Sequence, residues 1–258
     1  MKTKSLGFIG GGRITKIILQ VIDNNKSEYK AIVVYDINSD ILASLKNQFP
    51  GIQIAGTALD AAKQDMVFLA LHPPAIMETL ELVKDQFKAS SILISLAPKI
   101  TIEKIAARLP NIKNIVRLIP NATSIINEGY NPVCFSKEMS DWKKQSMLSI
   151  LRRMGHTFEV PEHKLESYAI LSAMLPTYFW FQMKELVDIG CHTGLSTAES
   201  QNAVRDTMVA AIKTYFYSGL QPDEVIDLIP VKPIGEHEQQ IKKIYNDKLL
   251  ALFEKLRP

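Results

Sequence analysis

The chain has 258 residues, a length that suits one large domain or two modest ones. Hydrophobic residues make up 47% of it and charged residues 22%, which is typical of a soluble globular protein. The net charge of +3 comes from scattered basic residues, and no uncharged apolar run reaches the ~18–20 residues of a membrane span, so neither a nucleic-acid surface nor a membrane segment is expected.

Compartment and metal content follow from three further patterns. A glycine-rich turn begins where the apolar core of a signal peptide would have to continue, so we expect a cytoplasmic protein. Cys134 and Cys191 lie far apart and form no C-x-x-C pair, so we interpret them as small apolar residues in a reducing compartment. The histidines show no ligand spacing, and no metal site is expected.

The first element is an apolar run that ends in three glycines, Gly10-Gly11-Gly12, followed by an apolar helical pattern from Ile14. This order predicts a strand, a tight turn and a helix. Gly10 allows a sharp turn, and Gly12 lets a pyrophosphate approach the backbone at the positive end of the helix that starts near Arg13. Thr15 replaces the third glycine of the usual G-x-G-x-x-G pattern, so the fingerprint is imperfect.

A β-branched run over residues 31–35 ends at Asp36. An acid at the end of the second strand accepts hydrogen bonds from the ribose hydroxyls of a dinucleotide and repels a 2′-phosphate. The two patterns together predict an NAD or NADP site, with NAD slightly favoured by Asp36. The alternative is a structural strand-to-helix turn that binds nothing.

Strands and helices then alternate through the first half. Further strands are predicted at 51–55, 66–71, 91–96 and 114–119, with helices at 40–48, 58–63, 76–87 and 101–109 between them. This alternation predicts βαβ units and a doubly wound, mostly parallel sheet of the Rossmann type. Two more strands, at 130–135 and 157–160, flank a helix at about 141–154.

Ligands bind such sheets at the carboxyl ends of the strands. The chain places glycine, acid, histidine, proline and asparagine residues at those ends. The candidate cofactor-binding residues are Gly10, Gly11, Gly12, Arg13, Ile14, Asp36, Leu71, His72, Pro73, Ala97 and Asn121.

The strand pattern stops after Pro161, and helices are predicted at 164–175, 177–190, 196–218, 223–228 and 236–256. We therefore predict a dinucleotide-binding domain over 1–161 and an all-helical domain over 162–258. The second is small and rich in aromatic residues, which favours burial against a second copy of the chain. The alternative is that these residues pack only on their own first domain.

Four motifs in the first half resemble those of pyrroline-5-carboxylate reductases. They are Gly7-Phe8-Ile9-Gly10-x-Gly12, Leu69-Ala70-Leu71-x-Pro73, Ile94-Ser95-Leu96-Ala97 and Val116-Arg117-Leu118-Ile119-Pro120-Asn121. The resemblance implies a Rossmann domain, an interlocked helical dimerisation domain, and hydride transfer from NAD(P)H to a cyclic imine carboxylate. β-Hydroxyacid dehydrogenases match less well, since Lys184 lies a turn too far for their catalytic lysine, and deazaflavin-dependent NADP reductases have a shorter helical part.

The substrate half departs from the family. Of the family's S-G-S-G-P-A-Y stretch, Ser172, Pro176 and Tyr178 match, while Met174 and Leu175 add volume. The family's S-P-G-G-T-T loop corresponds to residues 233–238, where Glu236-His237-Glu238 replaces neutral donors. We therefore expect pyrroline-5-carboxylate to be a poor substrate.

The candidate catalytic residues are His237, Ser172 and Asn121. A histidine between two acids tends to keep the proton that an imine or ketone reduction needs, although Glu-His-Glu is also typical of a solvated first helical turn. Asn121 follows a strand and is placed to bond the carboxamide or the substrate; it is also a common turn residue after proline. The expected partners are a small-molecule substrate and a second copy. The alternative function is a dinucleotide-binding sensor or interaction protein that has lost turnover.

Overall fold

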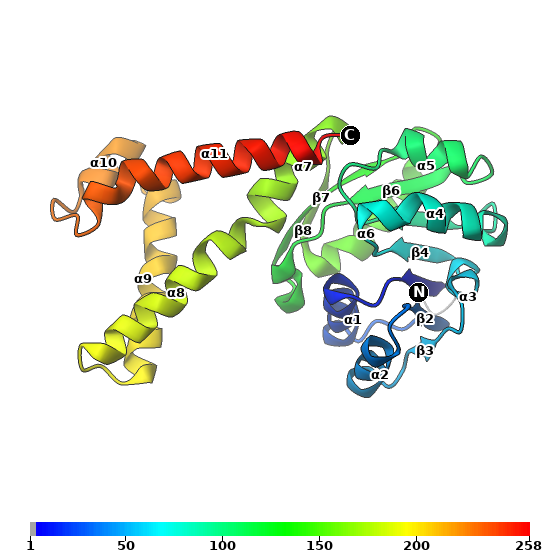
Figure 1. Ribbon diagram of the computed structural model, residues 1–258, viewed down its shortest axis with the longest axis horizontal. Coiled ribbons are helices and arrows are strands. Elements are labelled where there is room, and N and C mark those ends of the chain that lie inside the picture. The colour runs from blue at the N-terminus through cyan, green and yellow to red at the C-terminus, as the bar shows by residue number, and fades with distance from the viewer. Residues whose placement is uncertain (1–3) are drawn as a thin grey trace. The chain divides into compact units, whose positions relative to one another are not determined.

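The computed structural model describes residues 4–258, and its first half is built on one mixed sheet (Figure 1). The sheet has the order β3-β2-β1-β4-β5-β6-β7-β8 in the described part of the chain. The strands are β1 (Ser5–Ile9), β2 (Ala31–Tyr35), β3 (Gln53–Ile54), β4 (Met66–Leu69), β5 (Ile92–Ser95), β6 (Asn114–Leu118), β7 (Gly129–Phe135) and β8 (Gly155–Glu159).

The first six strands are parallel, which confirms the predicted doubly wound sheet. β7 pairs antiparallel with β6 because only the short turn η2 (Ala122–Ile126) separates them, too little chain for a crossover. β8 then runs parallel to β7. The carboxyl ends of β1 to β6 therefore share one edge of the sheet.

Helices connect the strands and form most of the second half. They are α1 (Arg13–Asn24), α2 (Ser39–Gln48), α3 (Ala58–Ala62), α4 (Pro73–Val83), α5 (Ile102–Arg108), α6 (Asp141–Leu151), α7 (Leu165–Tyr168), α8 (Leu175–His192), α9 (Thr197–Tyr217), α10 (Pro222–Asp227) and α11 (Glu238–Leu256).

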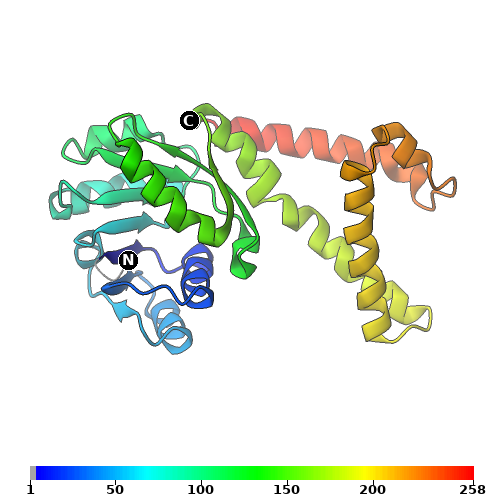
Figure 2. The same ribbon diagram turned by 180° about the vertical axis from the view of Figure 1, so that it is seen from behind.

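The core lies on both faces of the sheet. One cluster joins the sheet to α1, α2 and α6, and a second joins it to α3, α4 and α5 (Figure 2). Phe8 of β1 stacks on Phe68 of β4 with ring centroids 4.8 Å apart. Strands covered on both faces read as continuous apolar runs, which is why β4 and β5 were predictable from the sequence.

The described chain divides into two compact units. The first runs to Met174 and includes Phe253–Pro258, and the second is Leu175–Leu252. The sequence placed the end of the first domain at residue 161, whereas the compact unit extends further because Leu165 and Ala169 are buried beside β6 and β7. Leu256, at the end of α11, packs on this same cluster.

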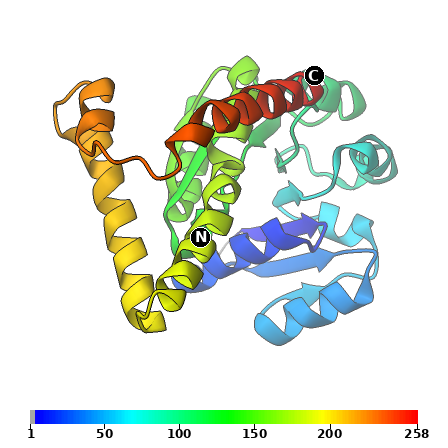
Figure 3. The ribbon, with the colours of Figure 1, turned by 60° about the vertical axis from the view of Figure 1, so that its left-hand side comes forward.

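The second unit is a set of helices with no apolar core of its own. α8 and α9 contact each other beside the turn that joins them (Figure 3), where a Cβ on Gly190 would lie 2.6 Å from Ser200 Oγ, so glycine permits this close approach. Every buried apolar side chain among the described residues lies at or before Ile170. Phe181, Phe216 and Tyr217 are 66%, 67% and 82% exposed.

Candidate dinucleotide site

The glycine turn between β1 and α1 has the geometry of a phosphate-binding turn. Gly10 has φ +105°, and a Cβ there would lie 2.4 Å from the Ala70 carbonyl oxygen, so only glycine fits. Gly12 caps α1, and a Cβ on it would meet no atom within 4 Å. No side chain caps α1, and its first turn holds no acid, so the helix N-terminus is free to receive an anion.

Thr15 explains why the imperfect fingerprint still forms the turn. Its buried hydroxyl donates a hydrogen bond of 2.6 Å to the carbonyl oxygen of Gly10. In the sequence pattern alone, Thr15 is only a missing glycine. The structure shows that it anchors the turn instead.

Asp36 lies at the end of β2 and is fixed by the backbone around it. Its Oδ2 accepts a hydrogen bond of 2.6 Å from the N–H of Gly11, and its Oδ1 accepts one of 2.8 Å from the N–H of Asn38. The carboxylate is therefore held beside the glycine turn in the position that a ribose-binding acid occupies in dinucleotide-binding folds.

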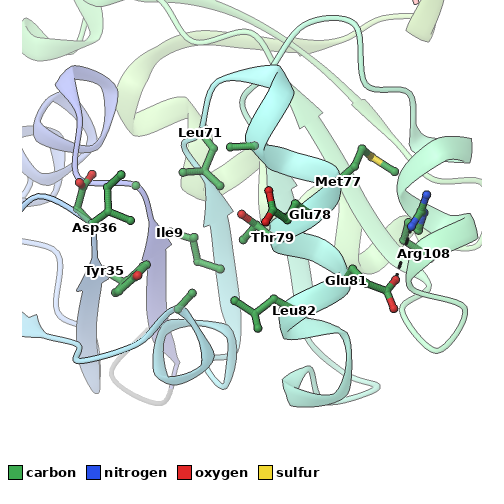
Figure 4. A pocket seen from close by; sticks show the side chains of 14 residues that line it. Ile9, Tyr35, Asp36, Leu71, Met77, Glu78, Thr79, Glu81, Leu82 and Arg108 are labelled. Atoms are coloured by element: carbon green, nitrogen blue, oxygen red, sulfur yellow. Dashed lines mark ion pairs between the residues drawn. The ribbon is translucent and has the colours of Figure 1, made fainter.

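A cavity of about 740 Å³ opens beside Asp36 (Figure 4). Ile9, Tyr35 and Asp36 of the sheet edge line one side of it, and Thr79 and Leu82 of α4 line the other. Its far end carries an exposed ion pair between Glu81 and Arg108, with 3.6 Å between their charged atoms. An apolar cavity next to an acid at this strand end has the character of a site for the adenosine half of a dinucleotide.

The next two strand ends supply the remaining candidate cofactor residues. His72 precedes α4 as its cap residue, Pro73 occupies the first helical position, and neither capping bond nor acid occupies that helix end. Leu71 lines the cavity, and Ala97 is buried after β5. The turn, Asp36 and these residues lie along one edge of the sheet, as the pattern predicted.

Asn121 and Ser172 lie together, but the polar groups of both side chains are engaged in hydrogen bonds within the protein. Asn121 Nδ2 donates a hydrogen bond of 2.6 Å to the Ser172 carbonyl oxygen, and Asn121 Oδ1 accepts bonds from the N–H and hydroxyl of Thr123. The Ser172 hydroxyl donates to the carbonyl oxygen of Tyr168 at 2.7 Å. Both side chains are at most 5% exposed.

His237 belongs to the second unit and lies in η6 (Gly235–His237), just before α11. Its ring is 59% exposed, and its Nε2 lies 3.4 Å from Glu236 Oε1. Glu238 pairs instead with Lys242 at 2.7 Å, and the Lys242 ammonium keeps the pKa of Glu238 below its ordinary value. Within this chain His237 therefore faces one acid rather than two.

Arg117 is a charged residue to which the sequence motifs assigned no role of its own. It is fully buried in β6 and forms ion pairs with Glu162 and Glu166. An arginine inside an otherwise apolar strand pattern indicates a buried ion pair, because a buried charge requires partners.

Comparison with known proteins finds similar sequences and similar folds among dinucleotide-dependent reductases. The family model described as NADP oxidoreductase, coenzyme F420-dependent, matches residues 5–99. Pyrroline-5-carboxylate reductase of Escherichia coli is 25% identical over 228 residues, which are 88% of this chain and 84% of that protein. Among solved structures, a pyrroline-5-carboxylate reductase from Coxiella burnetii is 26% identical with a TM-score of 0.68, covering 99% of this chain and 95% of its own.

A Plasmodium falciparum pyrroline carboxylate reductase with NADP bound shares the fold. It is 22% identical with a TM-score of 0.77 and covers 99% of this chain and 95% of its own. These likenesses extend over both units, including the helical half in which the sequence motifs are weak. They confirm the predicted fold class and the resemblance to pyrroline-5-carboxylate reductases.

Proposed function

We propose that this chain, an NAD(P)-dependent reductase that is similar to pyrroline-5-carboxylate reductases, reduces a small cyclic imine or keto carboxylate. A bound NAD(P)H would supply the hydride that the carbon of the C=N or C=O bond takes up. The nitrogen or oxygen takes up a proton. The turn, uncapped helix and fixed Asp36 bind and orient the cofactor, which supplies the hydride.

The observation that carries the proposal is the construction of the glycine turn. Gly12 leaves open space at an uncapped helix N-terminus, while Asp36 is held against the same turn by the Gly11 N–H. A turn with only a structural role does not need an acid fixed at the neighbouring strand end. Both features suit a pyrophosphate and its ribose.

We further propose that NAD(H) is preferred over NADP(H). The Asp36 carboxylate accepts ribose hydroxyl bonds and repels a 2′-phosphate, and Ile37 beside it, 92% exposed, offers no positive charge. Fluorescence titration with NADH and NADPH tests this. Asp36→Asn keeps an acceptor for the Gly11 N–H while removing the charge, so it should shift the preference toward NADPH; tighter NADPH binding by the wild type contradicts the proposal.

The proposed proton donor is His237, and the acids beside it set the substrate range. An anionic substrate is opposed by Glu236 and Glu238, which replace neutral donors of the family, although Lys242 already neutralises Glu238. Steady-state kinetics with pyrroline-5-carboxylate, for the wild type and for His237→Thr, tests this. A wild-type kcat/KM above roughly 10⁴ M⁻¹s⁻¹ would show that the acids do not restrict this substrate.

We propose that the chain acts as a homodimer through its second unit. Helices α8, α9 and α11 expose large apolar side chains. In the described structure, Ser200 of α9 is the buried residue of these three helices. Apolar helices without a core of their own need a second surface, and a second copy supplies one. Light scattering at micromolar concentration should give about twice the 29.0 kDa chain mass.

The second candidate is a dinucleotide-binding protein without turnover. The internal bonds of Asn121 and Ser172 favour it, because they occupy groups that would otherwise reach a substrate. Mixing the protein with NADH and a panel of cyclic imines and keto acids separates the two functions. Fluorescence of bound NADH that decays with any of these compounds supports the reductase, and stable fluorescence with all of them supports the sensor.

A further inference from the structure

A buried arginine joins two carboxylates beneath the loop that follows β5. Arg117 Nη1 lies 2.9 Å from Glu162 Oε1, and Arg117 Nη2 lies 2.6 Å from Glu166 Oε1. The side chains of Arg117 and Glu166 are 1% and 2% exposed, while that of Glu162 is 33% exposed. The group links β6 to η4 (Glu162–Lys164) and α7, which precede Ser172 in the chain.

The same two carboxylate oxygens also hold the backbone of that loop. Glu166 Oε1 accepts a hydrogen bond of 3.2 Å from the N–H of Lys99, and Glu162 Oε1 accepts one of 2.7 Å from the N–H of Ile102. Lys99, in the middle of the segment between β5 and α5, and Ile102, the first residue of α5, are thus each tied to one guanidinium through one carboxylate. An ion pair that served only to join β6 to α7 would not need either backbone bond.

The loop so held has an uncommon conformation. Lys99 has φ +74°, in the left-handed region that residues other than glycine rarely adopt, and its side chain is exposed. Such a conformation persists where its surroundings fix it. Here the bond from the Lys99 N–H to Glu166 supplies that restraint.

We propose that Arg117, Glu162 and Glu166 form a positioning triad that sets the 97–101 loop against the nicotinamide ring of the bound cofactor. This inference rests on the proposed function, because it takes Ala97, at the carboxyl end of β5, to lie beside the ring. None of the triad touches the reacting atoms. The triad fixes the surface on which the nicotinamide lies, while the turn and Asp36 bind the rest of the cofactor independently.

The test compares NADH with ADP-ribose, which has the same adenosine and pyrophosphate but no nicotinamide. The ratio of their dissociation constants measures how well the ring is seated, and the ADP-ribose constant alone measures the remainder. Both are obtained on the full chain by NADH fluorescence titration and by competition with ADP-ribose.

Three variants separate positioning from simple loss of stability. Glu166→Gln weakens the triad directly. Lys99→Val leaves the triad intact but places a β-branched residue, which strongly disfavours positive φ, at an exposed position. Lys99→Gly removes the same lysine charge but accepts φ +74° without strain, so it is the matched control.

We expect Glu166→Gln and Lys99→Val each to reduce the NADH preference over ADP-ribose by roughly tenfold, because a misplacement of about 1 Å in a positioning surface can cost up to about 10²-fold. The ADP-ribose constant should stay within about threefold, and Lys99→Gly should resemble the wild type. If Glu166→Gln fails to fold, Lys99→Val and Lys99→Gly decide the matter. An unchanged ratio in Lys99→Val overturns the triad, whereas wild-type protein that binds neither ligand overturns the proposed function itself.

Discussion

Thr15 shows how a single residue can replace a fingerprint glycine. Its hydroxyl satisfies the Gly10 carbonyl inside a fully buried site. Thr15→Val preserves the shape but leaves that carbonyl without this donor, so we expect the free energy of unfolding to fall by about 1–3 kcal/mol. Urea unfolding measures the change. The control is Ser149→Ala on the exposed surface of α6, which should stay within about 0.5 kcal/mol; equal losses in both would contradict the anchoring role.

Cys134 provides a prediction that depends on pH. Burial raises the pKa of its thiol from 9.0 to about 12, so the native protein holds this proton while the unfolded chain releases it. The free energy of unfolding should therefore decline between pH 9 and 12 through this group, and Cys134→Ala should remove that contribution. At pH 8 iodoacetamide should leave Cys134 unmodified in native protein and modify it in urea, as peptide mass mapping reports. Equal labelling in both states would contradict its burial.

The positions of the candidate cofactor residues in the fold were largely predictable because they depend on local pattern. The glycines, Asp36 and Ala97 all follow strands whose apolar runs are plain in the sequence, and parallel strands share one carboxyl edge. The bonds of Asn121 and the triad of Arg117 were not predictable. They join residues far apart in the chain, and no local pattern specifies such a partner.

Among the elements, η5 (Ala169–Ala173) is one that no periodicity indicated. The sequence predicted an unbroken helix over 164–175, but the segment forms a π-helical turn in which the N–H of Met174 reaches back to the Ala169 carbonyl. This turn presents the Ser172 carbonyl to Asn121. Widened helical turns often occur at functional sites, and here the partner that stabilises it comes from the end of β6.

Asn121→Asp tests the importance of that contact for the element. An aspartate keeps an acceptor for Thr123 but loses the donor to Ser172 and places two oxygens against each other, so unfolding should become easier by about 2–4 kcal/mol. Chemical denaturation gives the value. Asn38→Asp is the matched control, because Asn38 caps α2 through its side-chain oxygen and aspartate caps as well. A loss no larger than that of Asn38→Asp would show that the contact adds little.

At the scale of the whole molecule, the exposed apolar side chains of the second unit form the surface through which we propose that the chain dimerises. Phe181→Glu or Phe216→Glu places a charge in the proposed dimer surface, so light scattering should show a shift toward the monomer mass. Trp142→Glu on α6 is the control, since this side chain is 73% exposed but lies in the first unit. Dimers retained by both phenylalanine variants would place the interface elsewhere.

In the described residues no helix is long and apolar enough to cross a bilayer.

The packing of Leu256 on the first unit has a consequence for how the protein is made. Leu256 joins Leu165 and Ala169 beside β6 and β7, yet the ribosome synthesises it only after the entire second unit. The sheet and its two main core clusters can form early during translation, because all their residues precede α8. The third cluster remains incomplete until the end of α11 has left the exit tunnel, so the dinucleotide-binding half finishes folding after the helical half has been synthesised.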